Sequence, residues 1–583
     1  MKILLIHSED DPEKGPWASL PWDRIVDLGR GGAGTYESWS RRFDCPVEPL
    51  DSLRNGFDDF RQVRELLGLG RGRLTDEHGL DWWEIMSILL IGEMGTLILL
   101  ERLVRTLGSG DEVHVSRPGF HADVLRFLLG TRLRVFPVRG DAAKLRPGRY
   151  LQLSAKLSKA QIVDIFWDKY DPGYQLRGRV VGRRPASTRP VILLPSAYVN
   201  VSRTGMAYAN TFPEENFLLV TTRQSGWVQD PPRNVSAAWL SSYASVRDRT
   251  GENLEMQSRW KSLKQELTAV PEFDMLNRLG QLASFPQRFR HGLEVRDAWR
   301  NVLDREPVQG VLCADDSNPY TRIPLLLARE RGLPNIACHH GALDGRYTFK
   351  RSFGEVIWAK GKMEKDYLVR GCGVPGEKVE LGAPALPASW SAREDSGGHA
   401  SRPYLVFFSE LYEVSGGRPE EFYRDVLPAL ADLALATGRE LVVKLHPAES
   451  ERERTRMLAR RLSAEQRNAT RVVSGPLTDD LLAKTWFGVT ILSTVAMECA
   501  VRGIPCFLCK WLEFWPYGYV DQFIRFGVGI GLKSPREIEK IPQYLREHAV
   551  KTNVRENCWR PVSPGRLREL VGSSQKPCTE VAS

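Results

Sequence analysis

Short apolar runs alternate with longer helical stretches along most of this 583-residue chain, and this alternation limits the fold more than any other feature. Such an alternation is typical of parallel sheets that are covered by helices. The sequence therefore predicts an α/β protein, with long helical stretches at residues 57–67, 82–107 and 236–304. The expected strands are residues 2–6, 24–28, 112–115, 134–138, 190–195, 216–222, 310–314, 335–338, 356–359, 379–381, 404–409, 440–445, 471–473, 487–492, 505–508 and 529–532.

The order of these elements divides the chain into sections. At about 100–200 residues per domain, a chain of this length contains three or four domains. Residues 389–403, with the sequence SWSAREDSGGHASRP, are the best linker candidate because they are rich in Ser, Gly and Arg. The expected sections are an N-terminal α/β domain of unknown role at 1–150, a connector at 151–189, two Rossmann-like lobes at 190–388 and 404–570, and a disordered tail at 573–583.

The charge and cysteine content limit the partners and the compartment. A net charge of +9 suits anionic ligands or an anionic membrane face, although an Arg-rich solvated surface explains it equally well. The 81 basic and 72 acidic residues are interspersed, so we expect no nucleic-acid partner. Nine scattered cysteines indicate reduced thiols in a cytoplasmic protein. The CxxC sequence at 506–509 lies in an apolar run and favours a buried strand over a zinc site.

Neither apolar segment near the start of the chain has the pattern of a membrane or export signal. Residues 1–6 are followed at once by polar residues, which is too early for a signal peptide. Residues 85–107 are interrupted by Glu93 and Glu101 and fall short of the ~18 apolar residues of a spanning helix. We expect a cytoplasmic protein, and peripheral association with the inner face of a membrane stays open.

The first motif with chemical potential is VVKLHP at residues 442–447, where an expected strand ends at His446. Pro447 is suited to the first position of a helix. The His446 imidazole would lie at the carboxyl end of the strand and donate to a phosphate oxygen, and Lys444 would add positive charge. A His-Pro pair also arises by chance, so the position after a strand carries this interpretation.

The second motif is GVTILSTVAME at residues 488–498, where a strand leads into a helix. Ser493 is a natural N-cap, and the amides that follow it form an anion site that the Ser493 and Thr494 hydroxyls would join. Glu498 lies one turn into the helix and would accept hydrogen bonds from ribose hydroxyls. The alternative is simple helix capping, with Glu498 solvated.

Two further strands end in ionisable residues. The strand at 310–314 is followed by Asp315 and Asp316, either of which would serve as a general base for an acceptor hydroxyl. The alternatives are capping of the next helix and a paired-acid metal site, for which no third ligand is found.

The strand at 335–338 is followed by His339, His340 and Gly341. Side chains alternate along a strand, so we expect the two histidines to point in opposite directions, with His340 toward the ligand. Asp344 and Arg346 follow in the same loop and would line it.

These motifs, in this order, resemble those of GT-B-fold glycosyltransferases of bacterial surface polysaccharide biosynthesis, such as capsule Kdo transferases, polysialyltransferases and CDP-glycerol glycerophosphotransferases. The resemblance covers residues 190–560 and implies two facing Rossmann-like lobes, here preceded by an additional α/β domain. It implicates His446, Ser493 and Thr494 in binding the phosphate of a cytidine nucleotide. The family's catalytic base is an acid in the N-terminal lobe, for which Asp315 and Asp316 are the nearest candidates.

The resemblance implies a metal-independent transferase that moves a sugar from a nucleotide-sugar donor to a glycan or lipid-linked glycan acceptor. The donor is the substrate, and no cofactor is expected. Residues 190–388 would bind the acceptor and residues 404–570 the donor. A UDP-sugar epimerase of the same fold and a non-catalytic carbohydrate-binding scaffold stay open as alternatives, because fold alone does not determine function.

Overall fold

A computed structural model describes the chain except for twelve segments. These are residues 8–9, 30–32, 138–185, 229, 245–247, 387–401, 411–421, 425, 447–448, 514–517, 548–553 and 574–583. The expected connector, linker and tail lie largely or wholly outside the described residues.

The described strands form three sheets, and every pair of neighbouring strands is parallel. The first sheet has five strands in the order β3-β2-β1-β4-β5. Its strands are β1 (Lys2–Ile6), β2 (Arg24–Asp27), β3 (Val47–Pro49), β4 (Glu112–Val115) and β5 (Leu133–Val135). The helices of this part of the chain are α1 (Ala33–Phe43), α2 (Phe57–Gly68), α3 (Trp82–Ser87), α4 (Ile91–Arg105) and α5 (Phe120–Leu129).

The second sheet has seven strands in the order β12-β11-β10-β9-β6-β7-β8. Its strands are β6 (Val191–Ser196), β7 (Phe217–Thr221), β8 (Val235–Trp239), β9 (Val308–Cys313), β10 (Asn335–Ala337), β11 (Val356–Ala359) and β12 (Val379–Leu381). The helices between them are α9 (Val199–Thr211), α10 (Thr250–Leu267), α11 (Pro271–Arg278), α12 (Phe285–Arg305), α13 (Pro319–Glu330) and α14 (Lys362–Asp366).

The third sheet has six strands in the order β15-β14-β13-β16-β17-β18. Its strands are β13 (Tyr404–Phe408), β14 (Glu440–Lys444), β15 (Thr470–Val473), β16 (Thr485–Thr490), β17 (Cys506–Cys509) and β18 (Ile530–Leu532). The helices that follow in the chain are α16 (Leu427–Ala436), α17 (Glu451–Arg461), α18 (Ala464–Asn468), α19 (Asp479–Ala483), α20 (Val495–Val501), α21 (Tyr519–Arg525), α22 (Ile541–Glu547), α23 (Val554–Cys558) and α24 (Pro564–Ser573).

All three sheets follow the doubly wound strand order. Counted from its own first strand, each sheet runs 3-2-1-4-5, and the two larger sheets continue past the fifth strand. This is the Rossmann-like order, in which the chain switches direction between strands 1 and 4. The α/β prediction with parallel, Rossmann-like sheets is therefore confirmed. The switch points lie between β1 and β4, between β6 and β9, and between β13 and β16.

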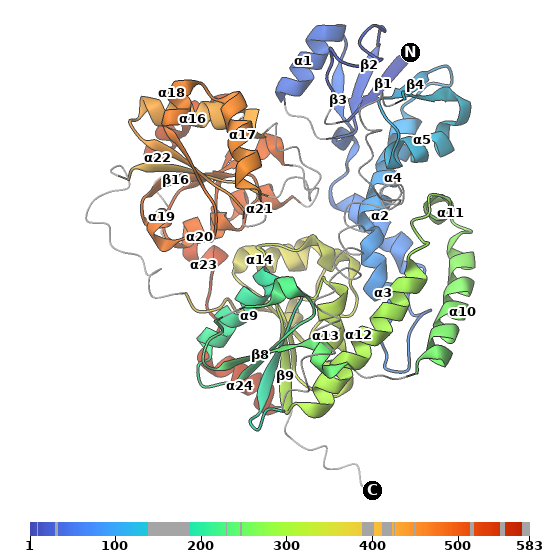
Figure 1. The fold of residues 1–583 in the computed structure, drawn as a ribbon, viewed down its shortest axis with the longest axis vertical. Coiled ribbons are helices and arrows are strands. Elements are labelled where there is room, and N and C mark those ends of the chain that lie inside the picture. The colour runs from blue at the N-terminus through green and yellow to red at the C-terminus, as the bar shows by residue number, and fades with distance from the viewer. Residues whose placement is uncertain are drawn as a thin grey trace. The chain divides into compact units, whose positions relative to one another are not determined.

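The chain folds into two compact units that do not follow the order of the sequence. One unit holds residues 1–59, 93–156 and 387–558, and the other holds residues 60–92, 157–386 and 559–583. The chain end returns to the second sheet, where Ala383 pairs with Pro561 and Leu567 of α24 packs into the core (Figure 1). Residues 60–92, which belong to the first section of the sequence, are joined to the second sheet's unit by an ion pair between Glu84 and Arg322.

Two short strands, β3 and β8, are not among the strands predicted from the sequence. β3 has the sequence VEP and β8 the sequence VSAAW, and neither contains a run of large aliphatic residues. The prediction that residues 236–304 are largely helical is wrong at its start, because residues 235–239 pair with β7 as the edge strand β8.

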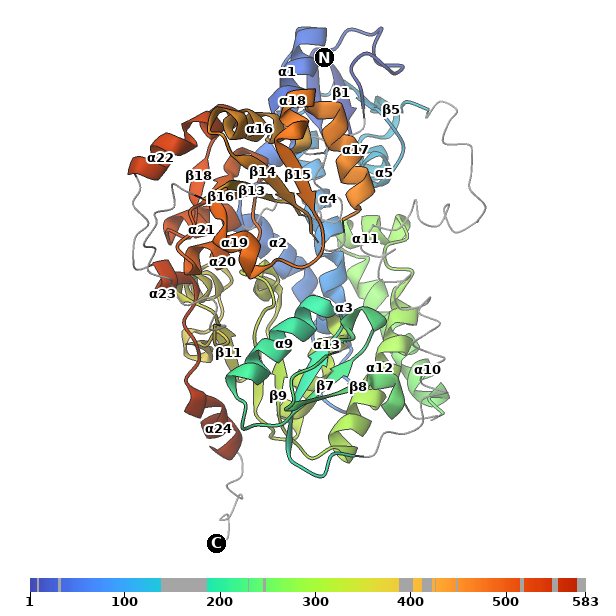
Figure 2. The same ribbon diagram turned by 60° about the vertical axis from the view of Figure 1, so that its left-hand side comes forward.

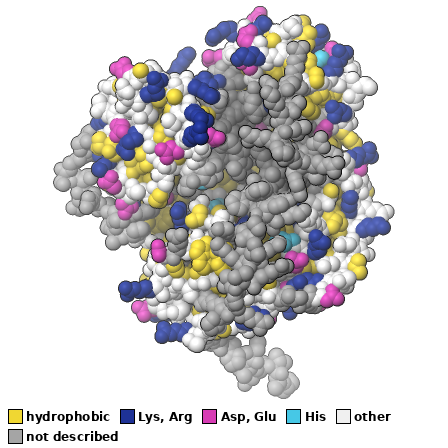
Figure 3. All heavy atoms as spheres, viewed as in Figure 1, with side chains coloured by type: hydrophobic (Ala, Val, Ile, Leu, Met, Phe, Trp, Pro, Cys, Tyr) yellow, Lys and Arg dark blue, Asp and Glu magenta, His cyan; other side chains and the backbone are white. Residues whose placement is uncertain are grey.

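One helical stretch of the described residues, Trp82–Arg105, is long and apolar enough to cross a membrane by length and composition alone. Of its most apolar 18-residue window, 67% is buried inside the protein, as in the core helix of a folded domain. On the face drawn in Figure 3, Lys and Arg side chains are scattered among Asp and Glu.

Candidate functional site

The main polar cluster lies at the switch point of the second sheet, where the chain leaves strands β6 and β9. Tyr198 follows β6, and Asp315 follows β9. The Tyr198 hydroxyl donates to Asp315 Oδ2 over 2.5 Å and lies 3.3 Å from the ring nitrogens of His340. The cluster thus joins the ends of β6, β9 and β10, which are neighbours in the sheet.

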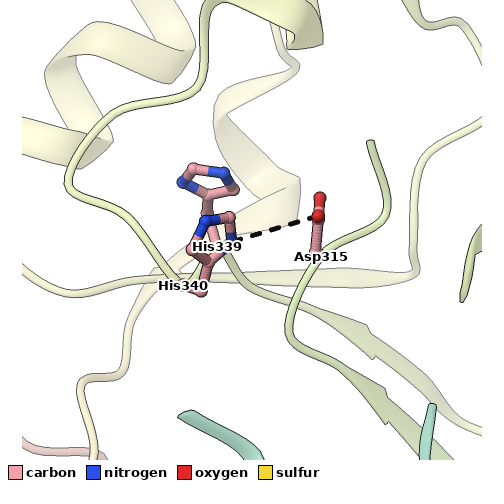
Figure 4. Close-up of side chains that lie close together, drawn as sticks. All are labelled: Asp315, His339 and His340. Carbon is pink, nitrogen blue, oxygen red and sulfur yellow. Dashed lines mark ion pairs between the residues drawn. The ribbon is translucent and has the colours of Figure 1, made fainter. Parts of the chain in front are cut away.

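Asp315 is fully buried and remains a carboxylate. Burial opposes its ionisation, but the nearby His340 and Arg346 outweigh burial and lower the Asp315 pKa below its usual value. His340 Nδ1 lies 4.0 Å from Asp315 Oδ2 (Figure 4). Burial, strengthened by the Asp315 charge, raises the pKa of the Tyr198 phenol well above its usual value, so Tyr198 stays a hydrogen-bond donor.

The expectation that His339 and His340 point in opposite directions is wrong. Their ring centroids are 4.4 Å apart, and both rings have a nitrogen close to Asp315. The reason is that β10 ends at Ala337, so the alternation of a strand no longer applies to the two histidines. Burial lowers the pKa of both imidazoles, that of His339 to about 3, and both are therefore neutral at pH 7.

The proton on His339 is fixed by a backbone contact. The Gly341 amide donates to His339 Nδ1 over 3.1 Å, so the neutral ring carries its hydrogen on Nε2. This buried Nε2 has no hydrogen-bond partner among the residues that the structure describes. It is therefore a buried donor that no acceptor among the described residues satisfies.

Asp315, His339 and His340 offer one possible metal ligand each, and these atoms lie within 4.8 Å of one another. A metal ligand needs a lone pair on the coordinating nitrogen, however, and a protonated Nε2 has none. Nδ1 of the same ring is occupied by the Gly341 amide. The donor set fits proton transfer and hydrogen bonding better than it fits a metal centre.

Asp316, the other predicted acid, takes a different role. Its Oδ1 accepts from Lys350 Nζ over 2.8 Å, and both side chains are 1% exposed. Lys350 also donates to the Ser317 hydroxyl over 2.7 Å. Asp316 thus forms a buried ion pair, while Asp315 lies beside His340.

The remaining predicted residues of this loop are brought to the same cluster. Asp344 accepts from the Arg346 amide and from Arg346 Nε, both over 3.1 Å, and it accepts from the Ser317 hydroxyl. Burial opposes ionisation of Asp344, but Arg346 and His339 outweigh it and lower the pKa far below its usual value. The Gly341 carbonyl accepts from Lys360 Nζ over 2.6 Å.

Sequence reasoning missed Tyr198, Lys350, Lys360 and Glu364. Lys360 directly follows strand β11, and Tyr198 lies two residues after β6, so both carry the same signal as the predicted residues. Burial raises the pKa of Glu364 to about 7, although Lys360 opposes the shift. The pairing of Lys350 with Asp316 spans 34 residues of sequence and has no local signal.

The third sheet has its own polar cluster, in which Lys444 is the last residue of β14 and His446 follows it two residues later. Lys444 Nζ donates to the carbonyls of Leu445 and Gly475, each over 2.7 Å, so the amine is turned to the backbone. Burial lowers the pKa of His446, and the Lys444 charge adds to this effect. Pro447 lies outside the described residues, and the next helix, α17, begins at Glu451.

The switch point of the third sheet is occupied by a carboxylate of the chain itself. Glu410 Oε1 accepts from the Thr490 hydroxyl over 2.8 Å, from the Leu492 amide over 3.0 Å and from the Ile491 amide over 3.4 Å. Burial raises the Glu410 pKa, although these hydrogen bonds oppose the shift. The Ile491 and Leu492 amides, which follow β16, are therefore bound by a side chain of the protein itself.

The predicted N-cap is wrong by one residue. Helix α20 begins at Val495 with Thr494 as N-cap, and Ser493 Oγ accepts from the Val495 amide over 3.4 Å. The chain makes a short bend at residues 491–492 before the helix. Burial raises the pKa of Glu498 to about 7, against the effect of Arg502.

The first sheet also joins polar residues across its switch point, although the sequence assigns it no chemistry. His7 Nδ1 lies 2.9 Å from Ser116 Oγ, which connects the ends of β1 and β4. All three switch points thus carry hydrogen-bonding side chains.

No family model and no curated protein matches this chain. Solved structures with similar folds include a UDP-GlcNAc 2-epimerase from Neisseria meningitidis bound to UDP-GlcNAc, at 12% identity and a TM-score of 0.38, which covers 67% of this chain and 100% of that one. A calicheamicin glycosyltransferase matches at 13% identity and a TM-score of 0.37, with 66% and 94% of the chains covered. MurG of Acinetobacter baumannii matches at 12% identity and a TM-score of 0.38, with 67% and 100% covered. Likenesses with TM-scores below 0.5 carry no information about the reaction.

Proposed function

We propose that this protein is a glycosyltransferase of the GT-B type, which moves a sugar from a nucleotide-activated donor to a glycan acceptor. The observation that carries the proposal is the Tyr198–Asp315–His340 cluster at the switch point of the second sheet. Ligands of doubly wound sheets bind at such a place. A neutral imidazole beside an ionised carboxylate is suited to take a proton from a hydroxyl group.

In the proposed reaction, the acceptor hydroxyl gives its proton to a ring nitrogen of His340 while its oxygen bonds to the anomeric carbon of the donor sugar. The bond from that carbon to the nucleotide phosphate breaks, and the electron pair leaves with the phosphate oxygen. Asp315 stabilises the imidazolium that forms. The buried His339 Nε2 hydrogen would bond to a substrate oxygen, where it favours developing negative charge.

The donor side of the proposal concerns the third sheet. His446, Ser493 and Thr494 would bind the nucleotide phosphate, and Glu498 would accept hydrogen bonds from the ribose. Lys444 contributes positive charge only, because its amine is held by two carbonyl oxygens. The reaction needs no metal in this scheme, and a cytidine nucleotide stays the favoured donor through the family resemblance.

A UDP-sugar epimerase is the second candidate, and one observation favours it. Two neutral imidazoles lie 4.4 Å apart beside one carboxylate. Such a pair suits a reaction that removes a proton from a sugar carbon and returns one to it. An epimerase of this kind uses no acceptor.

The biological setting is proposed on the same basis. The acceptor would be a bacterial surface polysaccharide or a lipid-linked glycan. The protein would act in the cytoplasm, at the inner face of the membrane where the acceptor is lipid-linked. A carbohydrate-binding scaffold without activity is the non-enzymatic alternative.

Nucleotide binding is the first test. Thermal unfolding is measured with CMP, CDP, UDP, GDP and dTDP, for the wild type and for His446→Ala. A ligand at 100 times its dissociation constant stabilises the folded state by about 2.7 kcal/mol. In a chain of this size, we expect a rise of about 2–4 °C in the melting temperature with a cytidine nucleotide, lost in the variant.

The outcomes separate the candidates. A rise in melting temperature with uridine nucleotides only would indicate a UDP-sugar donor and favour the epimerase. If no nucleotide changes the melting temperature, the non-catalytic scaffold is favoured. Nucleotide release that depends on an added acceptor supports the transferase, whereas conversion of a UDP-sugar without an acceptor supports the epimerase.

A further inference from the structure

Two tryptophans form a flat, partly exposed stack at the edge of the second sheet. The ring centroids of Trp227 and Trp239 are 4.5 Å apart, and their planes differ by 6°. Trp239 ends the edge strand β8 and is 7% exposed, whereas Trp227 is 36% exposed. The buried ring supports the exposed one, so Trp227 presents a rigid indole surface to the outside.

The loop that carries Trp227 is fixed to the turn that carries Tyr198. The short helix Gln224–Gly226 comes directly before Trp227. The Gly226 carbonyl accepts from the Ser202 hydroxyl over 2.5 Å, and the Ser225 hydroxyl donates to the Ala197 carbonyl over 3.2 Å. A Cβ atom on Gly226 would lie 3.2 Å from the Tyr198 amide nitrogen, so the two segments are in direct contact.

This contact puts Trp227 at the same end of the sheet as the acid–base cluster. β6, β7 and β8 are parallel neighbours, and the Trp227 loop follows β7 as Tyr198 follows β6. β7 and β8 lie side by side in Figure 2. Tyr198 in turn donates to Asp315. The exposed indole therefore lies at the same edge of the sheet as the proposed base.

The chemistry of the surface selects its ligand. An indole face is apolar and carries the negative side of the ring quadrupole, which attracts the slightly positive C–H groups on one face of a pyranose ring. The hydroxyl groups of such a ring lie at its rim and keep their contacts with water or polar side chains. A glycan with one ring held in this way would lie at the same edge of the sheet as His340.

We propose that Trp227, supported by Trp239, is a sugar-binding platform that stacks on a pyranose ring of the acceptor glycan. The assignment of that ring to the acceptor rests on the proposed function. The stacking itself does not, because it needs only the neutral sugar and the indole face.

The test uses the full chain and three neutral probes: maltotriose, cellotriose and triacetylchitotriose. Saturation-transfer NMR is recorded with the wild type, Trp227→Ala and Trp227→Tyr. We expect saturation of ring C–H protons by the wild type with at least one probe. The affinity should be about ten-fold weaker in Trp227→Ala, which lacks the indole face, and should recover in Trp227→Tyr.

Phe127→Ala is the matched control, because Phe127 is an exposed aromatic side chain, at 45%, on α5 of the other unit. This variant should bind the probes as the wild type does. Melting temperatures of all variants are compared, so that loss of the fold is recognised as such.

Three results would overturn the platform. One is the absence of saturation of all three probes by the wild type. Another is a loss of nucleotide binding in Trp227→Ala with sugar binding intact, which would make the indole a base-stacking site. The third is a change in the sedimentation coefficient in Trp227→Ala, which would make it a contact with a second copy.

The experiments test the sugar-binding platform and the proposed transferase activity independently of each other. Sugar binding through Trp227 without any nucleotide binding leaves the platform and removes the transferase. Acceptor-dependent nucleotide release with the same acceptor KM in Trp227→Ala leaves the transferase and removes the platform. If both hold, the acceptor KM rises about ten-fold in Trp227→Ala while kcat stays within about two-fold, because the ring binds the acceptor and does not contact the reacting atoms.

Discussion

At the scale of single residues, the positions of protons decide what the second sheet's cluster is able to do. His340 is neutral because burial lowers its pKa, although the Asp315 charge opposes the shift. Asp315 is ionised because His340 and Arg346 outweigh the effect of burial. The cluster thus holds a neutral imidazole beside an ionised carboxylate at pH 7, which are the states that the proposed base and its partner need.

Removing either partner of this pair should abolish most of the activity. For His340→Ala and for Asp315→Asn we expect nucleotide release in the presence of acceptor to fall about 10²–10⁴-fold, the usual effect of losing a general base. The double variant should be no slower than the worse single variant, because the two residues act as a unit. Initial rates measure this effect. His291→Ala, which alters a half-exposed histidine of α12, should keep the wild-type rate. Wild-type rates in both single variants would contradict the assignment.

His339 should make the fold sensitive to acid. Burial lowers its pKa to about 3 from the ordinary value of 6.5, so between these values the unfolded chain binds a proton that the folded chain does not. His339 therefore does not affect the pH dependence of stability above pH 6.5. Below this value, the free energy of unfolding decreases by about 1.4 kcal/mol for each pH unit that the pH falls.

We expect His339→Asn, whose Oδ1 is able to accept from the Gly341 amide, to lose less stability than the wild type between pH 7 and pH 5. Denaturant unfolding at pH 7, 6 and 5 gives the two curves. Glu364, with a pKa raised to about 7, acts in the opposite direction in this window but is present in both proteins. Parallel curves would show that His339 is not held neutral by the fold.

At the scale of elements, close packing explains why residues 60–92 belong to the second sheet's unit. A Cβ atom on Gly292 of α12 would lie 2.3 Å from a ring carbon of Trp82 at the start of α3. Trp82 is fully buried, so its ring has no room to move. Glycine is therefore required where the two helices cross.

Gly292→Ala should destabilise the protein by about 1–3 kcal/mol, the usual cost of overpacking a core. Gly95→Ala in α4 is the matched control, since a Cβ there meets nothing within 4 Å and should stabilise the helix by about 0.5–1 kcal/mol. Urea unfolding measures both changes. A Gly292→Ala variant as stable as the wild type would mean that α3 and α12 separate easily.

The same scale shows what the sequence is able to predict. Strands with a continuous apolar run, such as β6 and β13, are recognised because burial on both faces leaves a local signature. β8 has only two small alanines between polar and aromatic residues, so its pairing with β7 decides its structure.

For the candidate site too, features with a local sequence signal can be predicted and features that depend on distant contacts cannot. Several residues that follow strands, such as Asp315 and His340, are predicted from the sequence, because the carboxyl end of a parallel strand is a ligand-binding place in any doubly wound sheet. Tyr198 and Lys360 also follow strands, but the sequence analysis missed them. The direction of the His339 side chain could not be predicted, because it depends on where β10 ends. The separation of Asp315 from Asp316 depends on Lys350, which is distant in sequence.

At the scale of the whole molecule, the two compact units are interleaved along the chain. The unit with the second sheet takes residues 60–92 from the first part of the sequence. These residues supply partners for two buried arginines, since Asp76 accepts from Arg296 over 2.9 Å and Glu84 pairs with Arg322. Both arginines are nearly inaccessible to solvent. A boundary at residue 150 would therefore cut through a core.

Deleting residues 1–150 should prevent the rest of the chain from folding, rather than produce two lobes without an accessory domain. The truncated chain lacks Trp82, so the surface of α12 against which this ring packs becomes exposed. It also lacks Asp76 and Glu84, so Arg296 and Arg322 each lose one carboxylate partner. Breaking one buried ion pair costs about 3–5 kcal/mol, and two such losses approach the whole stability of a domain. We expect residues 151–583 alone to aggregate in size-exclusion chromatography, and co-expression of residues 1–150 as a separate chain to restore a soluble complex. A monodisperse truncated chain with the full-length melting temperature would show that the first section is dispensable for folding, and that its role lies in binding alone.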